Sequence, residues 1–103
     1  MTTATCRSRV PATHPSLPGH FAGAPIVPAA WQLVIVERIF REKMGSGLRI
    51  VGIATARFRA PWLPDVEMTI TLREGAADRV HFAVDAPDGR IADGVLVVAG
   101  TSE

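Results

Sequence analysis

The sequence predicts an α+β fold in which an antiparallel sheet of about five strands wraps around one buried helix. Residues 28–44 carry a helical pattern whose first half is apolar nearly all round, as expected for a helix that is buried at that end. Most of the chain after residue 47 alternates apolar and polar side chains between turn signals, which is typical of strands. A single sheet packed on one apolar helix buries both patterns.

The helix is expected from Pro28 to Met44. Proline is favoured at the first helical position because its missing N–H would have no partner there. Arg41 and Lys43 place cations in the last turn, where they suit the helix dipole. The Gly-Ser-Gly stretch at 45–47 then ends the helix.

The strands are expected as one weak strand near the N-terminus and four stronger ones after the helix. Turn signals rich in Pro, Gly and Asp separate the last four, and we expect these to follow one another as a meander. The predicted ranges are 4–10, 48–60, 66–73, 79–86 and 91–99.

Length and composition predict one globular domain over residues 1–103. The net charge of +1 argues against nucleic-acid binding, which needs an excess of basic residues. No apolar run approaches the roughly 20 residues of a membrane span, and the N-terminus lacks the apolar core of a signal peptide. With Cys6 as the single cysteine, neither an internal disulfide nor a cysteine metal cluster can form. We therefore expect a cytoplasmic protein without a metal.

Residues 11–28 hold five of the eight prolines, together with several apolar side chains. Such a segment is no regular helix or central strand, and it is too apolar for a solvated linker. A loop of this kind ahead of a helix indicates the wall of a site.

Two motifs in this sequence resemble a known family. Residues 19–28, GHFAGAPIVP, are similar to the GHFPGxPxxPG stretch of the β-hydroxyacyl-acyl carrier protein dehydratases, and the preceding HPSL resembles short standalone members such as those of aryl-polyene clusters. Residues 56–65, ARFRAPWLPD, resemble the second signature of that family. The resemblance covers residues 8–99 and implies a hotdog fold that dimerises by joining sheet edges.

The resemblance also implies a site. His20 would be the base that removes the Cα proton, the Ala29 N–H would polarise the thioester carbonyl, and the Ile26 carbonyl would orient the imidazole. The remaining substrate-binding residues would be Gly23 in the same loop, the apolar surface near Phe21, Trp31, Leu33 and Phe58, and Gln32 near the pocket mouth. His14 and His81 are expected to be a turn residue and a solvated residue.

The sequence departs from the family where the acid should stand. The family places Glu or Asp fourteen positions after the motif histidine, and this position is Val34 here. Glu37 lies about one turn later, roughly 4.5 Å along the axis, and either replaces the acid or pairs with Arg41. Ala22 and Ala29 also replace the family's proline and helix-opening glycine.

Three functions remain open at this point. The first is dehydration of 3-hydroxyacyl thioesters in fatty acid or polyene biosynthesis, with the acyl group carried on the phosphopantetheine of acyl carrier protein or CoA and with no other cofactor. The second is a degenerate subunit that pairs with another hotdog protein, since the family takes the histidine from one subunit and the acid from its partner. The third is an acyl thioesterase or acyl binder. Homodimer and heterodimer both fit.

Overall fold

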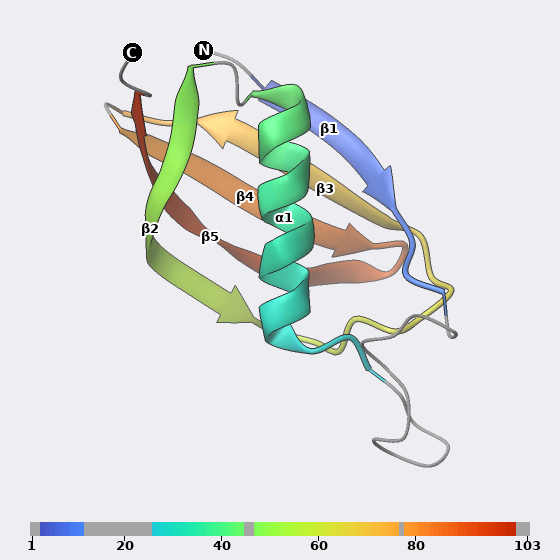
Figure 1. Cartoon of the computed structure of the whole chain (residues 1–103). Coiled ribbons are helices and arrows are strands. Elements are labelled where there is room, and N and C mark those ends of the chain that lie inside the picture. Colours follow the sequence, from blue (N-terminus) through green and yellow to red (C-terminus); the bar gives the residue numbers. More distant parts are fainter. Residues whose placement is uncertain (1–2, 12–25, 45–46, 77, 101–103) are drawn as a thin grey trace.

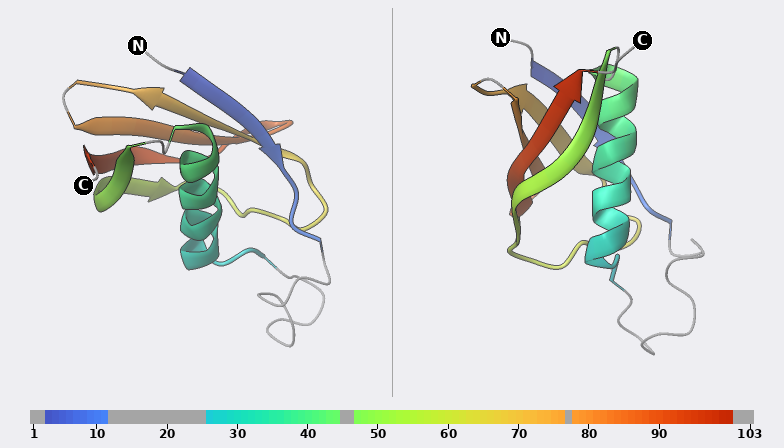
Figure 2. Two further views of the ribbon diagram at one scale, coloured as in Figure 1. Left: turned by 45° about the horizontal axis from the view of Figure 1, so that its top comes forward. Right: turned by 60° about the vertical axis from the view of Figure 1, so that its left-hand side comes forward.

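The computed structural model describes residues 3–11, 26–44, 47–76 and 78–100 and confirms the α+β prediction (Figure 1). Five antiparallel strands form one sheet in the order β1-β3-β4-β5-β2. The sheet curves around one helix, α1, which crosses a single face of it (Figure 2). The elements are β1 (Thr3–Ser8), α1 (Ala29–Lys43), β2 (Leu48–Phe58), β3 (Met68–Glu74), β4 (Arg79–Ala86) and β5 (Gly89–Gly100).

Helix α1 begins one residue later than expected. Pro28 has φ −62° and ψ 149°, so it is extended and precedes the helix instead of opening it. A φ of this size suits proline in either conformation, which is why the sequence alone did not fix the first residue. At the other end the Met44 N–H donates to the Phe40 carbonyl at 2.8 Å, and Arg41 and Lys43 lie in the last turn as predicted.

The buried face of α1 is a stripe. The expectation that the first half is buried all round is wrong for the single chain, because Val34 is 38% exposed and Ala29 and Ala30 are also exposed. One sheet covers only one side of a helix, and the spacing of the buried residues is that of a single helical face. These residues are Gln32, Ile35, Val36, Ile39 and Phe40.

The last four strands do not form the predicted meander. Strands β3, β4 and β5 do follow one another, but β2 pairs with β5 at the opposite edge of the sheet from β1. Residues 59–67 make no hairpin between β2 and β3. The Arg59 and Ala60 N–H groups donate to the Ile91 carbonyl at 2.7 and 3.2 Å, and the Asp65 N–H donates to the Val10 carbonyl at 2.8 Å. The segment therefore crosses from β5 toward the chain that leaves β1.

The core fills the space between α1 and the inner face of the sheet. The predicted alternation holds in β3 and β4, where every second side chain is buried against α1 and the others point outward. Trp62, from the crossing segment, is fully buried and closes one end of this core. The inward residues are Met68, Ile70, Leu72, Val80, Phe82 and Val84.

Candidate functional site

A groove between α1 and edge strand β2 is the candidate acyl site. It encloses about 180 Å³ and is apolar apart from one carboxylate, that of Glu37. Beside it, Ile53 on β2 is 48% exposed and Val34 on α1 is 38% exposed. In the single chain this apolar surface therefore stays open along the sheet edge. The lining residues are Leu33, Val36, Glu37, Ile50, Ile53 and Leu96.

Glu37 pairs with Arg41, as the i,i+4 spacing predicts. The Arg41 guanidinium donates to the Glu37 carboxylate at 3.2 Å, and both side chains are substantially exposed. An exposed pair of this kind contributes little to stability. Glu37 thus lines the groove and also forms an ion pair at the surface.

The backbone of Val27, which leads into α1, is held by hydrogen bonds at its N–H and at its carbonyl. The Val27 N–H donates to the Trp62 carbonyl at 2.8 Å, and the Gln32 side-chain amide donates to the Val27 carbonyl at 2.9 Å. Gln32 is 95% buried, so it braces the entry to the helix and does not line the groove. Among the described residues, Gln32 Oε1 and Trp62 Nε1 are buried without a hydrogen-bond partner.

Sequence reasoning missed this bracing role. Its signal was present, because Gln32 is the one polar side chain in an otherwise apolar stretch of helix. A buried polar group in such a place needs a hydrogen-bond partner, and the backbone carbonyl before the helix supplies it.

The structure describes part of the predicted site. Ile26 is 43% exposed just ahead of α1, and Ala29 is the first helical residue, so its N–H has no acceptor within the helix. Phe58 is 42% exposed at the end of β2 and shares the inner face with its cross-strand partner Ala92. The predictions for His14, His20, Phe21 and Gly23 fall on residues outside the described ranges.

Trp31 and Leu33 do not share one surface. Leu33 lines the groove beside β2, whereas Trp31 lines a separate hollow of about 220 Å³ between α1 and β1. There the Arg38 guanidinium lies 6.0 Å from the centre of the Trp31 ring, within range of a cation–π contact. The acyl surface expected from the sequence therefore divides across the helix, with Leu33 and Phe58 on the β2 side.

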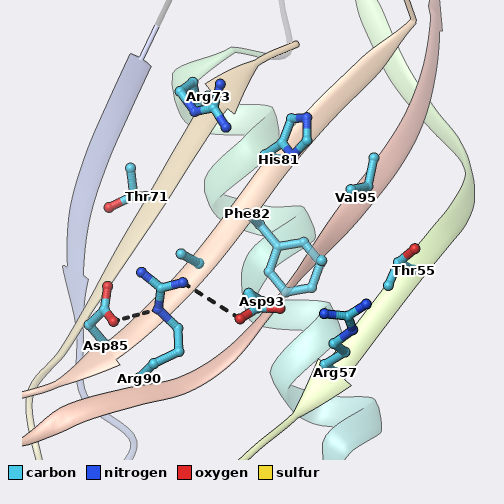
Figure 3. A pocket seen from close by; sticks show the side chains of 12 residues that line it. Thr55, Arg57, Thr71, Arg73, His81, Phe82, Asp85, Arg90, Asp93 and Val95 are labelled. Atoms are coloured by element: carbon cyan, nitrogen blue, oxygen red, sulfur yellow. Dashed lines mark hydrogen bonds and ion pairs between the residues drawn. The ribbon is translucent and has the colours of Figure 1, made fainter. Parts of the chain in front are cut away.

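The outward face of the sheet carries a larger hollow, of about 480 Å³ (Figure 3). It lies on the opposite side of the sheet from α1, and several of its walls are charged. His81, expected to be solvated, is half-buried in it and points outward. The sequence alone did not predict this hollow, because its residues are neighbours only through the register of four strands.

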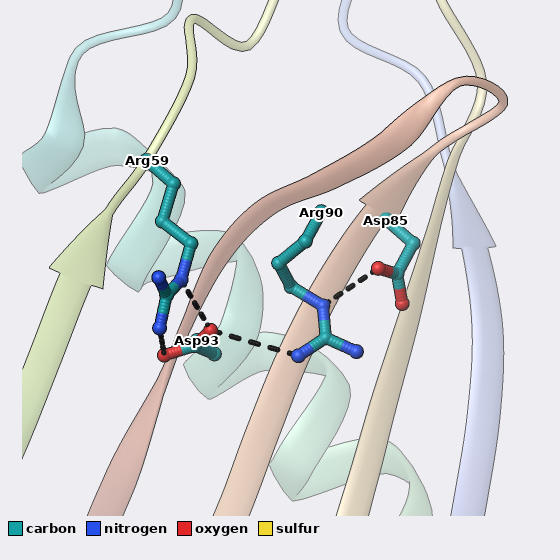
Figure 4. Close-up of polar contacts among 4 residues, drawn as sticks. All are labelled: Arg59, Asp85, Arg90 and Asp93. Atoms are coloured by element: carbon teal, nitrogen blue, oxygen red, sulfur yellow. Dashed lines mark hydrogen bonds and ion pairs between the residues drawn. The ribbon is translucent and has the colours of Figure 1, made fainter.

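Four charged residues form a chain of ion pairs at one end of this hollow (Figure 4). Arg59 binds Asp93 through two hydrogen bonds of 2.7 and 3.4 Å. Arg90 contacts Asp93 at 3.5 Å and donates to Asp85 at 2.6 Å. The Arg59 hydrogen bond is the main cause that lowers the pKa of Asp93 below its ordinary value. The hydrogen bond to Asp85 likewise raises the pKa of Arg90.

Neither a metal site nor a membrane span is found in the described part of the chain. No group of three or more His, Cys, Asp and Glu side chains there is placed to hold a metal ion. No helix in those residues is long and apolar enough to cross a membrane.

The sheet order and the single enclosed helix define a hotdog fold, which comparison with solved structures confirms. An uncharacterized protein from Erwinia carotovora subsp. atroseptica superposes with a TM-score of 0.85 at 20% identity, covering 98% of this chain and 86% of that one. The dehydratase heterocomplex ApeI:P from Xenorhabdus doucetiae gives 0.83 at 18% identity, with 94% and 87% covered. The R-hydratase PhaJ1 from Pseudomonas aeruginosa gives 0.70 at 16% identity, with 99% and 81% covered.

A model of the ApeI-like family, described as ApeI dehydratase, matches residues 1–95. The chain belongs to the ApeI-like family. No protein of curated function matches the sequence significantly. The family match supports a function of the hotdog dehydratase kind.

Proposed function

We propose that the chain is one subunit of a dehydratase for 3-hydroxyacyl thioesters, in which His20 is the base and a partner hotdog subunit supplies the acid. One observation carries the proposal. The apolar groove between α1 and β2 lies open at a sheet edge, beside Val34, the position at which the family resemblance expects a carboxylate. The chain thus offers an acyl surface without the usual proton donor.

The reaction needs two catalytic groups, a base and an acid. A neutral imidazole takes the proton from Cα, the C–O bond at Cβ breaks, and an acid protonates the departing hydroxyl so that water leaves. Negative charge grows meanwhile on the thioester oxygen, and the Ala29 N–H, which has no acceptor within α1, is suited to receive it. The acyl chain would lie along Leu33, Ile53 and Phe58, with the thioester on a phosphopantetheine arm.

A partner subunit would explain why the single chain exposes apolar side chains beside an open sheet edge. Val34 and Ile53 are large apolar residues at 38% and 48% exposure, and β2 is an edge strand with unpaired backbone groups. A second hotdog subunit along β2 would cover both and bring a carboxylate toward the site. The Xenorhabdus doucetiae neighbour is described as a dehydratase heterocomplex, which supports an assembly of two different subunits.

The substitution Val34→Glu tests the proposal, because it restores a carboxylate at the family's position. Val34 is 38% exposed in the single chain, so a carboxylate at this position does not disturb the core of the subunit. We expect the purified Val34→Glu chain to dehydrate a 3-hydroxyacyl-CoA about 10²–10⁴-fold faster than the wild-type chain, the usual contribution of general acid catalysis. The readout is the absorbance of the enoyl thioester.

Two further variants serve as controls for that assay. Val34→Gln has nearly the same shape as Val34→Glu but no acid, so it should leave the rate at the wild-type level. His20→Ala in the Val34→Glu background should remove the gain. The proposal is overturned if Val34→Glu is no faster than Val34→Gln, or if the gain survives without His20.

Glu37 is the alternative acid within the same chain, since among the described residues it is the carboxylate that lines the groove. If Glu37 donates the proton, the wild-type chain is active alone and Glu37→Gln loses that activity. If a partner supplies the acid, Glu37→Gln changes nothing. Thioesterase activity is separated in the same experiment, because hydrolysis releases free thiol whereas dehydration leaves the thioester intact.

A further inference from the structure

The first turn of α1 has no side-chain cap. Pro28, at the N-cap, makes no side-chain hydrogen bond to the helix, and no acidic residue lies in the first turn. The first N–H groups of a helix have no acceptor within it, and the exposed methyl groups of Ala29 and Ala30 cannot supply one. The Ala29 N–H therefore remains available to a thioester carbonyl, provided that the backbone holds it in a fixed direction.

The direction of the Ala29 N–H follows that of the Pro28 carbonyl, because both belong to one planar peptide unit. That carbonyl accepts a hydrogen bond of 3.0 Å from the backbone N–H of Gln32. The preceding peptide unit is held by the same residue, since the side-chain amide of Gln32 donates to the Val27 carbonyl at 2.9 Å. Between the two units the proline ring restricts the φ of Pro28, which is −62°. Gln32 thus holds both peptide units that lead to Ala29.

The junction before α1 is also anchored to the rest of the fold. The Val27 N–H donates at 2.8 Å to the carbonyl of Trp62, in the segment that passes the start of α1 (Figure 1). Val27, Gln32 and Trp62 are at most 5% exposed, and a hydrogen bond is stronger where water is excluded. Gln32 Oε1 is buried without a partner among the described residues, which offsets part of what the amide contributes to stability. The main effect of the amide is therefore a fixed geometry at the junction.

We propose that Gln32 is a positioning residue for the dehydration proposed above, and this inference rests on that function. Because Gln32 is buried away from the groove, it acts through the backbone and keeps the Ala29 N–H directed at the thioester carbonyl. A donor fixed in advance stabilises the growing charge because it does not reorient during the reaction. Misplacement by about 1 Å can cost about 100-fold in rate. Loss of the amide should therefore reduce polarisation of the carbonyl more than binding of the thioester.

Infrared spectroscopy of butanoyl-CoA bound to the full chain tests this role, with an isotopic label at the thioester carbonyl. The compound has no hydroxyl group and cannot be dehydrated, so the readout is polarisation of the carbonyl alone. We expect the wild-type chain to lower the carbonyl stretching frequency on binding. Gln32→Met should still bind butanoyl-CoA but lose most of that shift, because a thioether cannot donate to the Val27 carbonyl.

Ala29→Pro is the second variant, since it removes the N–H itself. Proline suits the first position of a helix, and the extended ψ of Pro28, 149°, suits a residue that precedes proline. This variant should therefore fold and lose the shift as Gln32→Met does. Ile39→Val is the matched control, because it removes a buried methyl group further along α1 and lowers stability without touching the junction. It should keep the full shift.

The inference fails if the wild-type chain does not bind the compound or leaves its carbonyl frequency unchanged. It also fails if either Gln32→Met or Ala29→Pro keeps the shift, or if Gln32→Met no longer binds. Equal losses in Gln32→Met and Ile39→Val would identify general destabilisation as the cause and overturn it as well. Dehydration by Val34→Glu is a separate measurement. Its failure leaves a shift that depends on Gln32 in place, and its success does not depend on that shift, so the two failures are distinguishable.

Discussion

Gly94 on β5 lies where the sheet leaves no room for a side chain. A Cβ at this position would overlap the Thr55 carbonyl oxygen and lie 2.6 Å from the Phe82 ring. Both neighbours are fixed, one by the backbone and the other by the core. We expect Gly94→Ala to lower the free energy of unfolding by about 1–3 kcal/mol, as overpacking does, measured by urea denaturation.

Gly52 on β2 is the matched control for Gly94. A Cβ there meets only Val97 Cβ, at 3.9 Å, which is ordinary van der Waals contact. Gly52→Ala should therefore change stability by less than about 1 kcal/mol. Equal losses in the two variants would show that close approach at Gly94 is not the cause.

Asp93 links stability to pH on the acid side. Because Arg59 holds the folded pKa of Asp93 below its ordinary value, Asp93 adds stability above the unfolded pKa, near ~3.9. That stability is lost as pH falls through the folded pKa. We expect Asp93→Asn to be less stable than wild type at neutral pH and to lose less stability on acidification, in urea unfolding followed down to about pH 3.

Asp78→Asn is the comparison for this pH effect. Asp78 also pairs with an arginine, Arg79 at 2.8 Å, but its side chain is 56% exposed and belongs to no larger network. Its variant should follow the wild-type curve, since exposed pairs contribute little. A wild-type pH profile in Asp93→Asn would contradict the role given to Asp93.

At the scale of elements, the junction before α1 depends on the Gln32 amide. Gln32→Met keeps the shape but leaves the Val27 carbonyl without its donor, while it also removes the unpaired Oε1. We expect a cost of about 1–2 kcal/mol. Gln32→Glu should cost more, because it places a carboxylate in a buried site against a carbonyl oxygen. Thermal unfolding at neutral pH measures both, and a Gln32→Glu chain at least as stable as Gln32→Met would refute this bracing role.

The sequence predicted elements whose signals are local. Strand β4 lies where the alternation of Val80, Phe82 and Val84 put it, and α1 differs from its prediction by one residue at each end. Partner choice between strands is not local. Nothing in residues 48–58 indicates pairing with β5. The pairing continues into the next segment, where the Arg59 and Ala60 N–H groups donate to the Ile91 carbonyl of β5.

Those residues of the candidate site that belong to a sequence motif or to the helical pattern were predictable. The second motif led to Phe58, and the helical pattern led to the apolar face that holds Leu33. The exposure of Val34 could not be read from hydrophobicity, since a helix that meets a partner is as apolar as one that is buried. The outward hollow required the register of four strands.

For the whole molecule, we expect the isolated chain to self-associate through β2. This edge strand exposes three large apolar residues, Val51, Ile53 and Phe58, whereas the β1 edge exposes Thr5 and Arg7. Ile53→Lys should shift the chain toward monomer in sedimentation equilibrium, because it places a charge in the apolar contact. Thr5→Lys, at the opposite edge, should sediment as wild type. A monomeric wild-type chain, or dissociation caused by Thr5→Lys alone, would contradict this arrangement.

The open stripe of α1 also has a consequence inside the cell. A newly made chain displays Val34 and Ile53 until another subunit arrives, and exposed apolar surface of this kind attracts chaperones and proteases. Binding a partner removes that signal and stabilises the fold by mass action. We therefore expect the lifetime of this protein to lengthen when a subunit that covers this edge is supplied, so that copies left single are cleared first.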